Sequence, residues 1–217
     1  MNPNDTKLQI AESFVDLART MPLEKISVSD IVAASQKNRK TFYYHFTNKS
    51  YLLAWIFRYD LAQQLQQAVP GANLVYTSTD DKALDEFPYY TLIKDGVRSI
   101  DGAAFVHALI ATFEARRSFY AQALADRSAD GLNTYLRRLY VPALEEDVRI
   151  ILNNRTLDER QVRFLAEFHL GALLDYLSAK LADRNETNIW DEFGPFKNIL
   201  HASIADAITR HQQVRSL

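Results

Sequence analysis

The sequence predicts an all-α fold. Glycine and proline each occur only six times in 217 residues, and no glycine precedes Gly71. Runs of alternating β-branched residues are absent, while long segments repeat apolar residues at helical spacing. Because 47% of the residues are hydrophobic, a chain of this length can bury a sizeable core. We see no internal repeat and no low-complexity segment.

Three short helices are expected at the N-terminus. The first begins at Thr6, buries a stripe that includes Phe14, and ends before Pro22. Ser27 and Asp30 have the spacing of a capping box, which starts a second helix. Asn38 is a suitable cap for a third helix, with Phe42 and Phe46 one turn apart on its buried side. The pattern predicts a helix, a tight turn and a second helix over residues 26–46.

The exposed face of the third helix combines cationic, aromatic and hydroxyl groups. Because successive residues turn by about 100°, Lys40 and Tyr44 point away from the buried stripe. No acidic residue occurs between Asp30 and Asp60, although the net charge of the chain is -2. This local basicity suits a phosphate backbone. A solvated pair of amphipathic helices is the simpler alternative. The basic residues of the segment are Lys37, Arg39, Lys40, Lys49 and Arg58.

The segment from about Thr6 to Trp55 resembles the DNA-binding domain of the TetR family of transcriptional regulators. The matching residues are Ile26-Ser27-Val28-Ser29-Asp30-Ile31 and Thr41-Phe42-Tyr43-Tyr44-His45-Phe46-Thr47-Asn48-Lys49. Arg39-Lys40-Thr41-Phe42-Tyr43 and Leu53-Ala54-Trp55-Ile56-Phe57 are most similar to the branch that contains the dihydroxyacetone-kinase regulator. Gln36 and Lys37 depart from the family, which often has glycine and a small apolar residue there. We therefore expect Gln36 to adopt a tight or left-handed conformation.

The resemblance, together with helix geometry, assigns DNA contacts to the turn and to the third helix. Arg39 and Lys40 are expected at base edges or adjoining phosphates, since recognition helices read the major groove with their N-terminal residues. Thr41, Tyr43 and His45 are expected at phosphates, and Tyr44 near a base. Lys49 is expected at a phosphate beside the start of the next helix. The predicted DNA-binding residues are Lys37, Arg39, Lys40, Thr41, Tyr43, Tyr44, His45 and Lys49.

Two domains are expected: a helix-turn-helix domain over residues 1–48, and a helical effector-binding and dimerisation domain over residues 49–217. A long helix over about 49–68 is apolar on more than one side and would connect them. The segment 70–100 is polar and is expected to be a mobile connection with one or two helical turns. The last two long helices are expected over about 158–181 and 193–211.

These last two helices carry more apolar surface than one small domain needs to bury, which indicates a pairing face. The resemblance agrees, because TetR-family regulators dimerise through a four-helix bundle made by two C-terminal helices of each subunit. A homodimer would bind a palindromic operator in double-stranded DNA. The predicted dimer residues are Leu165, Phe168, Ala172, Tyr176, Phe196, Leu200, Ile204 and Ile208.

A small-molecule effector site is expected among the helices after Gly102, where polar residues interrupt the apolar pattern. The alternative for each of these residues is a core position with its polar group satisfied by the backbone. The identity of an effector cannot be read from the sequence. The candidates are His107, Glu114, Arg116, Tyr120, Tyr135, Tyr140 and His169.

No motif indicates catalysis, a metal or a cofactor. The five histidines form no metal-ligand pattern, cysteine is absent, and we find no phosphate-binding glycine loop or serine elbow. No apolar run reaches the roughly 20 residues that span a bilayer. A non-enzymatic cytoplasmic protein, without a membrane partner, is expected.

We therefore predict a sequence-specific transcriptional regulator, and the family resemblance favours a repressor released by a small-molecule effector. The resemblance to the dihydroxyacetone-kinase branch leaves activation with a partner protein open. The alternative from another class is a protein-interaction or co-activator module whose helix-turn-helix has lost specific DNA binding.

Overall fold

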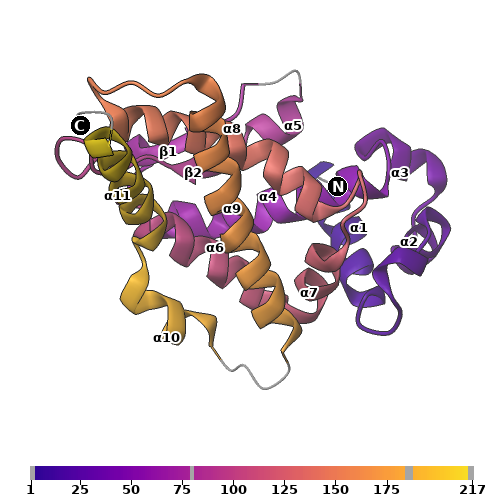
Figure 1. Ribbon diagram of the computed structural model, residues 1–217. Coiled ribbons are helices and arrows are strands. Elements are labelled where there is room, and N and C mark those ends of the chain that lie inside the picture. Colours follow the sequence, from indigo (N-terminus) through magenta and orange to yellow (C-terminus); the bar gives the residue numbers. More distant parts are fainter. Residues whose placement is uncertain (1–2, 79–80, 184–187, 215–217) are drawn as a thin grey trace.

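The helices arrange as a small N-terminal unit beside a larger helical body (Figure 1). The computed structural model describes residues 3–78, 81–183 and 188–214. The described residues are predominantly helical, and a two-stranded hairpin is the sheet formed among them. The all-α prediction is confirmed.

The N-terminal unit consists of α1 (Pro3–Leu17), η1 (Leu23–Lys25), α2 (Val28–Ala34) and α3 (Arg39–His45). The connecting helix α4 spans Lys49–Ala68. The body contains η2 (Gly71–Asn73), β1 (Leu74–Tyr76), α5 (Lys82–Asp85), β2 (Pro88–Thr91), α6 (Ala103–Ala115), α7 (Arg117–Ala125), α8 (Leu132–Leu152), α9 (Glu159–Ala182), α10 (Ile189–Phe193), η3 (Gly194–Phe196) and α11 (Ile199–Val214).

The predicted caps start α2, α3 and α4. The Ser27 hydroxyl accepts from the Asp30 amide, and the Asp30 carboxylate accepts from the Ser27 amide, which completes the capping box of α2. Asn38 accepts from the Thr41 amide at the start of α3, and Asn48 caps α4 in the same way. The first helix begins at Pro3, earlier than the expected Thr6.

One hydrophobic cluster runs from the N-terminal unit into the body. Phe14, Phe42 and Phe46 are buried at one end of it, and α4 carries it onward because that helix has buried residues on all sides. Trp55 of α4 contacts Phe46 of the N-terminal unit at a ring-centroid distance of 5.7 Å. The expected boundary between residues 48 and 49 is therefore crossed by continuous apolar packing.

The segment 70–100 contains a hairpin that was not expected. β1 and β2 pair antiparallel, the hairpin packs against α4, and the short helix α5 lies between the two strands in the sequence. Two features concealed it: β1 is too short to show alternation, and β2 begins with Pro88. Proline is tolerated at the first residue of a strand.

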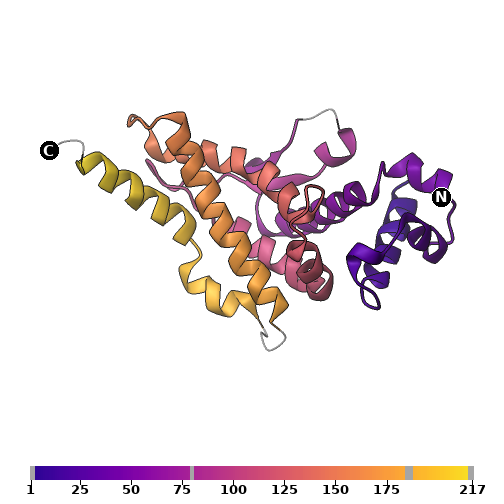
Figure 2. The same ribbon diagram turned by 45° about the vertical axis from the view of Figure 1, so that its right-hand side comes forward.

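The C-terminal helices differ from the expected pair in one respect. Instead of one helix over 193–211, the chain forms α10, η3 and α11, because Gly194 and Pro195 interrupt the segment. Figure 2 shows α9 crossing the body and α11 extending beyond it, at the end opposite the N-terminal unit. Helices α8, α9 and α11 contact one another.

Candidate nucleic-acid interface

The turn between α2 and α3 is tight and contains no glycine. Gln36 adopts a left-handed conformation with φ of 53°, as expected where related sequences have glycine. Ser35 is buried beside it, and its carbonyl accepts a hydrogen bond of 3.0 Å from the Gln9 side chain of α1. The N-terminal helix thus fixes the turn that sets the angle between α2 and α3.

The outer face of α3 is polar, aromatic and open to solvent. Phe42 is fully buried, whereas Tyr43 is 56% and Tyr44 81% exposed. Lys40 is exposed on the same helix. A tyrosine as exposed as Tyr44 gains nothing from burial within the protomer, so its place on this face suits contact with another molecule.

Two side chains of α3 are positioned by neighbours. The Arg39 guanidinium donates a 2.6 Å hydrogen bond to the Ser29 hydroxyl of α2, which aims it along the outer surface of the helix pair. The Thr41 hydroxyl donates to the Asn38 side chain at 3.1 Å, and its amide donates to the same oxygen at 2.8 Å. Lys37 is half-buried in the turn.

His45, in the last turn of α3, is half-buried against the Tyr44 ring, with ring centroids 4.9 Å apart. Burial lowers the pKa of His45 below its usual value, and the nearby Lys7 lowers it further. The neutral imidazole is therefore favoured in the free protein. A phosphate group close to His45 would oppose both effects.

Lys49 does not extend outward as expected. Its ammonium group donates to the carbonyl of Ile26 at 2.9 Å and to that of Leu23 at 3.1 Å. Lys49 therefore ties the start of α4 to the loop between α1 and α2. This position supports the helix-turn-helix from behind, and a phosphate contact by Lys49 stays a prediction.

Arg58 does not belong to the basic surface, because α4 buries it to 1% exposure. Its guanidinium donates to the carbonyl oxygens of Leu84 at 2.8 Å and Phe87 at 2.6 Å, and lies 5.4 Å from the centre of the Tyr89 ring. The sequence did contain a signal for this burial, since Arg58 lies on a helix with apolar residues on every side.

Arg58 is linked to the Asp85 carboxylate through Thr77, whose hydroxyl donates to Asp85 at 2.6 Å. The Arg58 guanidinium itself donates to the Thr77 hydroxyl at 3.3 Å and to the Tyr135 hydroxyl at 3.5 Å. The Nε atom of Arg58 is buried without a hydrogen-bond partner. A buried cation with uncharged acceptors is costly unless a counter-charge arrives.

The seven predicted effector residues lie in several places. Arg116 and Tyr120 meet Asp60 at the junction between the N-terminal unit and the body. Tyr135 contacts Arg58, and the Tyr140 hydroxyl donates to the Tyr89 carbonyl at 3.0 Å. The structure therefore brings together two pairs among the seven.

The other three effector candidates do not contact one another: His107 and Glu114 are about two turns apart on α6, and His169 is on α9. His107 is exposed and contacts the Trp190 ring edge-on, with centroids 4.5 Å apart. Glu114 accepts from the Ile189 amide at 2.6 Å and so anchors the start of α10. His169 bonds the Leu165 carbonyl within α9.

The predicted dimer residues divide into two groups. Leu200, Ile204 and Ile208 of α11 are buried within the protomer, where they pack toward α8 and α9. The remaining residues are exposed or half-buried on α9 and η3: Leu165, Phe168, Ala172, Tyr176 and Phe196. Phe164, at 61%, is an exposed apolar residue of α9 that the sequence interpretation missed, and Ile199, from the apolar arc expected on the last helix, is 51% exposed.

Within the described ranges, no helix has the length and apolar character needed to cross a membrane. The same residues contain no group of three or more histidine, aspartate or glutamate side chains that could hold a metal ion.

No protein-family model matches the chain. A curated relative, the HTH-type dhaKLM operon transcriptional activator DhaS of Lactococcus lactis subsp. lactis (strain IL1403), is 43% identical over 58 residues. That match covers 27% of this chain and 31% of the relative's length.

Two solved structures are similar over most of the chain. A TetR transcriptional regulator from Streptococcus agalactiae 2603V is 20% identical, with a TM-score of 0.52, and the match covers 91% of this chain and 94% of that one. The dihydroxyacetone kinase operon activator DhaS is 18% identical, with a TM-score of 0.46, and the match covers 96% of this chain and 97% of that one.

Fold and candidate interface together define an all-α chain with an N-terminal helix-turn-helix and a helical body. More specifically, this is the fold of a TetR-type transcriptional regulator, which confirms the resemblance stated from the sequence. The similar proteins are named as regulators rather than enzymes, in agreement with the expectation of a non-enzymatic chain.

Proposed function

We propose that this chain is a sequence-specific, DNA-binding transcriptional regulator that acts as a homodimer. The observation that carries the proposal is the outer face of α3, where Lys40, Tyr43 and Tyr44 are exposed above a fully buried Phe42. Such a face fits the major groove, with Arg39 and Lys40 near base edges. Thr41, Tyr43 and His45 contact phosphates beside them, and Tyr44 lies near a base.

The homodimer is proposed to form through α9 and the segment before α11. Phe164 and Phe168 stack on the outer face of α9 with ring centroids 5.8 Å apart, and both are about 60% exposed. Phe196 and Ile199 expose further apolar surface after α10. A second copy of the chain is the occupant we propose, since a two-fold axis then gives two recognition helices for a palindromic operator.

The direction of regulation has two candidates. The resemblance to the TetR family favours a repressor released by an effector. The name of the DhaS relative, a transcriptional activator, favours activation. A reporter gene behind the operator, measured with and without this chain, separates the two by the sign of the change.

The effector is proposed to be a small molecule with a negative charge that is recognised at Arg58. Tyr135 and Tyr140 are the predicted effector residues closest to this site, and Tyr89 covers the guanidinium. Asp85 is linked to Arg58 through Thr77, and an anionic group of the ligand would supply a further, direct counter-charge. Arg58 contacts the Leu84 carbonyl within α5 and the Phe87 carbonyl directly before β2, so such a ligand would act on the hairpin that packs on α4.

DNA binding is tested by gel shift with the DNA upstream of the chain's own gene, over a series of salt concentrations. We expect a specific complex that survives competitor DNA, with affinity that falls steeply as salt rises. Replacing Lys40 and Tyr43 with alanine should weaken this complex by about 10- to 100-fold while the fold stays intact. Lys94→Ala, which removes an exposed lysine from the body outside the proposed dimer face, is the matched control.

The alternative is a protein-interaction module whose helix-turn-helix no longer binds specific DNA. It predicts equal, weak binding to specific and random DNA at low salt, and no difference between the α3 variant and the Lys94→Ala control. That outcome would sink the regulator proposal.

A further inference from the structure

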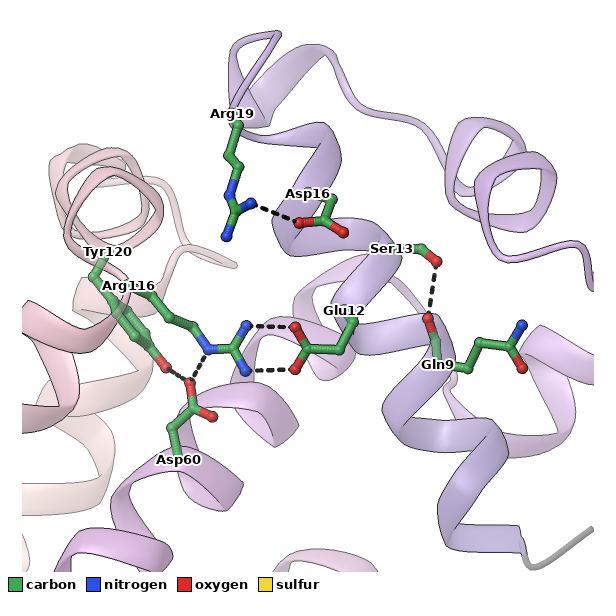
Figure 3. A network of polar contacts seen from close by, with 8 residues as sticks. All are labelled: Gln9, Glu12, Ser13, Asp16, Arg19, Asp60, Arg116 and Tyr120. Carbon is green, nitrogen blue, oxygen red and sulfur yellow. Dashed lines mark hydrogen bonds and ion pairs between the residues drawn. The ribbon is translucent and has the colours of Figure 1, made fainter.

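The N-terminal unit and the body meet at the break between α6 and α7. Arg116 occupies this break, with φ of -133° and ψ of 49°, and its side chain reaches α1. The guanidinium donates to both carboxylate oxygens of Glu12, at 2.9 and 2.5 Å (Figure 3). Its Nε atom contacts the Asp60 carboxylate of α4 at 2.9 Å. One cation therefore joins three helices.

The ion pair between Arg116 and Glu12 favours both of their charged forms, whereas burial works against the charge of Asp60. The Arg116 guanidinium lowers the pKa of Glu12, and Glu12 in turn raises the pKa of Arg116 above its ordinary value. Burial raises the pKa of Asp60, and the Tyr120 hydroxyl donates to it at 2.7 Å, which holds the carboxylate in place. Figure 3 shows the Arg116 side chain pointing toward Glu12, with Asp60 and Tyr120 behind it. Asp60 and Tyr120 thus orient the arginine that reaches the N-terminal unit.

A second contact from α7 holds the other end of α1. The Gln122 side chain accepts from the Leu23 amide at 2.8 Å and donates to the Ala18 carbonyl at 2.9 Å. These two backbone groups flank the loop that follows α1. Arg116, directly before α7, and Gln122, within α7, therefore fix the N-terminal unit at two points.

Apolar packing also crosses this junction, where Phe14 of α1 contacts Phe119 of α7 edge-on, with ring centroids 5.7 Å apart. An open cavity of about 780 Å³ lies beside these contacts, lined among others by Val15 of α1, by Arg19 of the following loop, and by Leu181 of α9. Apolar contacts are non-directional, whereas a bidentate arginine–carboxylate pair specifies an orientation. An isolated surface ion pair contributes little, but this one is bidentate and braced by Asp60 and Tyr120.

We propose that Glu12, Arg116 and Gln122 form a latch that sets the orientation of α1–α3 relative to the body, and thereby positions α3 for its operator. A shift of α6 or α7 would move the N-terminal unit through the latch, in addition to the path through α4. This inference rests on the proposed function. The latch residues position the recognition helix and contact no DNA themselves.

The test uses the protein's own tryptophans. Trp55, 2% exposed, lies where the N-terminal unit meets the body, and Trp190→Phe leaves it as the single reporter in the full chain. In that background Glu12→Ala with Gln122→Ala removes the latch and leaves the Arg116 contact to Asp60 intact. We expect acrylamide to quench Trp55 at least about twofold more strongly. Glu12→Gln keeps one acceptor for Arg116. Its Trp55 quenching should therefore lie between that of the Trp190→Phe parent and that of the double-alanine variant.

Asp16→Ala is the matched control for charge. Asp16 lies one turn further along α1 and pairs with Arg19 of the same unit at 3.2 Å, so its removal changes the charge of α1 equally but breaks no contact to the body. Acrylamide should quench Trp55 in the Asp16→Ala variant as strongly as in the Trp190→Phe parent. Circular dichroism then shows whether the helices of each variant remain formed.

DNA binding provides the second measurement. We expect the latch variant to bind the upstream DNA about tenfold more weakly than the Asp16→Ala control, a change of about 1.4 kcal/mol. Unchanged quenching, unchanged affinity, or an equal effect of Asp16→Ala would each overturn the latch. Absence of specific binding by the parent protein would overturn the proposed function instead, and the quenching result would still decide whether the latch exists.

Discussion

Lys40 and Lys49 show how surroundings decide the role of a residue. Lys40 is exposed on the outer face of α3, whereas the Lys49 ammonium is held by backbone carbonyls of the preceding loop. Arg39 and Arg58 differ in the same way, since one lies on the surface beside Ser29 and the other is buried under Tyr89. A count of basic residues alone could not separate contact residues from supporting ones.

The histidine in the recognition helix should make DNA binding depend on pH. Burial and Lys7 lower the pKa of His45 in the free protein, whereas nearby phosphates favour its protonated form. We expect affinity to rise about fivefold as pH falls from about 8 to about 5.5 at constant ionic strength, because a bound-state pKa above the free-state value adds a proton on binding. Fluorescence anisotropy of labelled operator DNA, recorded at each pH, measures this change in affinity.

His45→Gln should flatten that profile. Folding stability should change in the opposite direction: the folded pKa is below the unfolded value, so stability is lost as pH falls through 6.5 toward the folded pKa. A pH profile that is the same for the parent and for His45→Gln would contradict the assignment of His45 to the DNA surface.

Gln36 is the residue whose conformation costs the helix-turn-helix most. A non-glycine residue at φ of 53° is strained, and glycine relieves that strain. Gln36→Gly should therefore raise the free energy of unfolding by about 0.5–1 kcal/mol, measured by urea denaturation. Gln66→Gly, at an exposed position inside α4, should lower it by about 1 kcal/mol. Equal destabilisation by both changes would show that the turn is unstrained.

At the scale of elements, a buried polar cluster fastens the start of α11 to the body. His201 of α11 bonds Asp147 of α8 at 2.8 Å, and the Tyr90 hydroxyl of β2 donates to the same carboxylate. Asn198 accepts from the Gly102 amide at 3.1 Å. These contacts place α11 across the end of α8 and beside the start of α6.

Gly102 provides the space for this cluster, because a Cβ atom there would lie 2.5 Å from His201 Cε1. Gly102→Ala should therefore push His201 away from Asp147 and lower the free energy of unfolding by about 1–3 kcal/mol. Gly71→Ala, where no heavy atom lies within 4 Å of the added Cβ, should leave stability nearly unchanged. Thermal melts of both variants make the comparison, and equal melting temperatures would exclude a tight fit at Gly102.

The elements differ in how far the sequence could predict them. Caps at Ser27, Asn38 and Asn48 are local, so a few neighbouring residues determined where α2, α3 and α4 begin. The hairpin depends on packing against α4, a distant element, and three strand residues carry too little pattern. In the same way, periodicity located an apolar arc on α11 but could not show that α8 and α9 of the same protomer cover it.

The candidate site was predictable where its residues share one helix. The outer face of α3 follows from helical periodicity, and the structure exposes Lys40, Tyr43 and Tyr44 as expected. Arg116 was noted only as a polar residue after Gly102, because its partners Glu12 and Asp60 lie far away in the sequence. Contacts between distant elements leave no local pattern in a single sequence.

At the scale of the whole molecule, the N-terminal unit and α11 lie at opposite ends, with α9 between them (Figure 1). Dimerisation through α9 would leave the α3 face of each subunit free. It would also fix the distance between the two recognition helices through the body, α4 and the latch. Any change in the body that rotates α7 would then alter that distance.

The last prediction concerns the dimer itself. Phe164 and Phe168 are 61% and 60% exposed, so replacing both with glutamate removes no core contact but places charge in the proposed interface. We expect the wild type to sediment as a dimer at micromolar concentration and the double variant as a folded monomer. Its operator affinity should fall by about two orders of magnitude, because the second half-site no longer binds through a linked subunit.

Val97→Glu is the matched control, since Val97 is an exposed apolar residue, at 82%, outside α9 and α11. The control should remain dimeric and bind DNA as the parent does. A monomeric wild type would contradict the homodimer, and a double variant that still dimerises would place the pairing face elsewhere. The buried arc of α11 makes the second outcome informative: Leu200, Ile204 and Ile208 already pack within the protomer, so a surviving dimer would have to use other exposed residues.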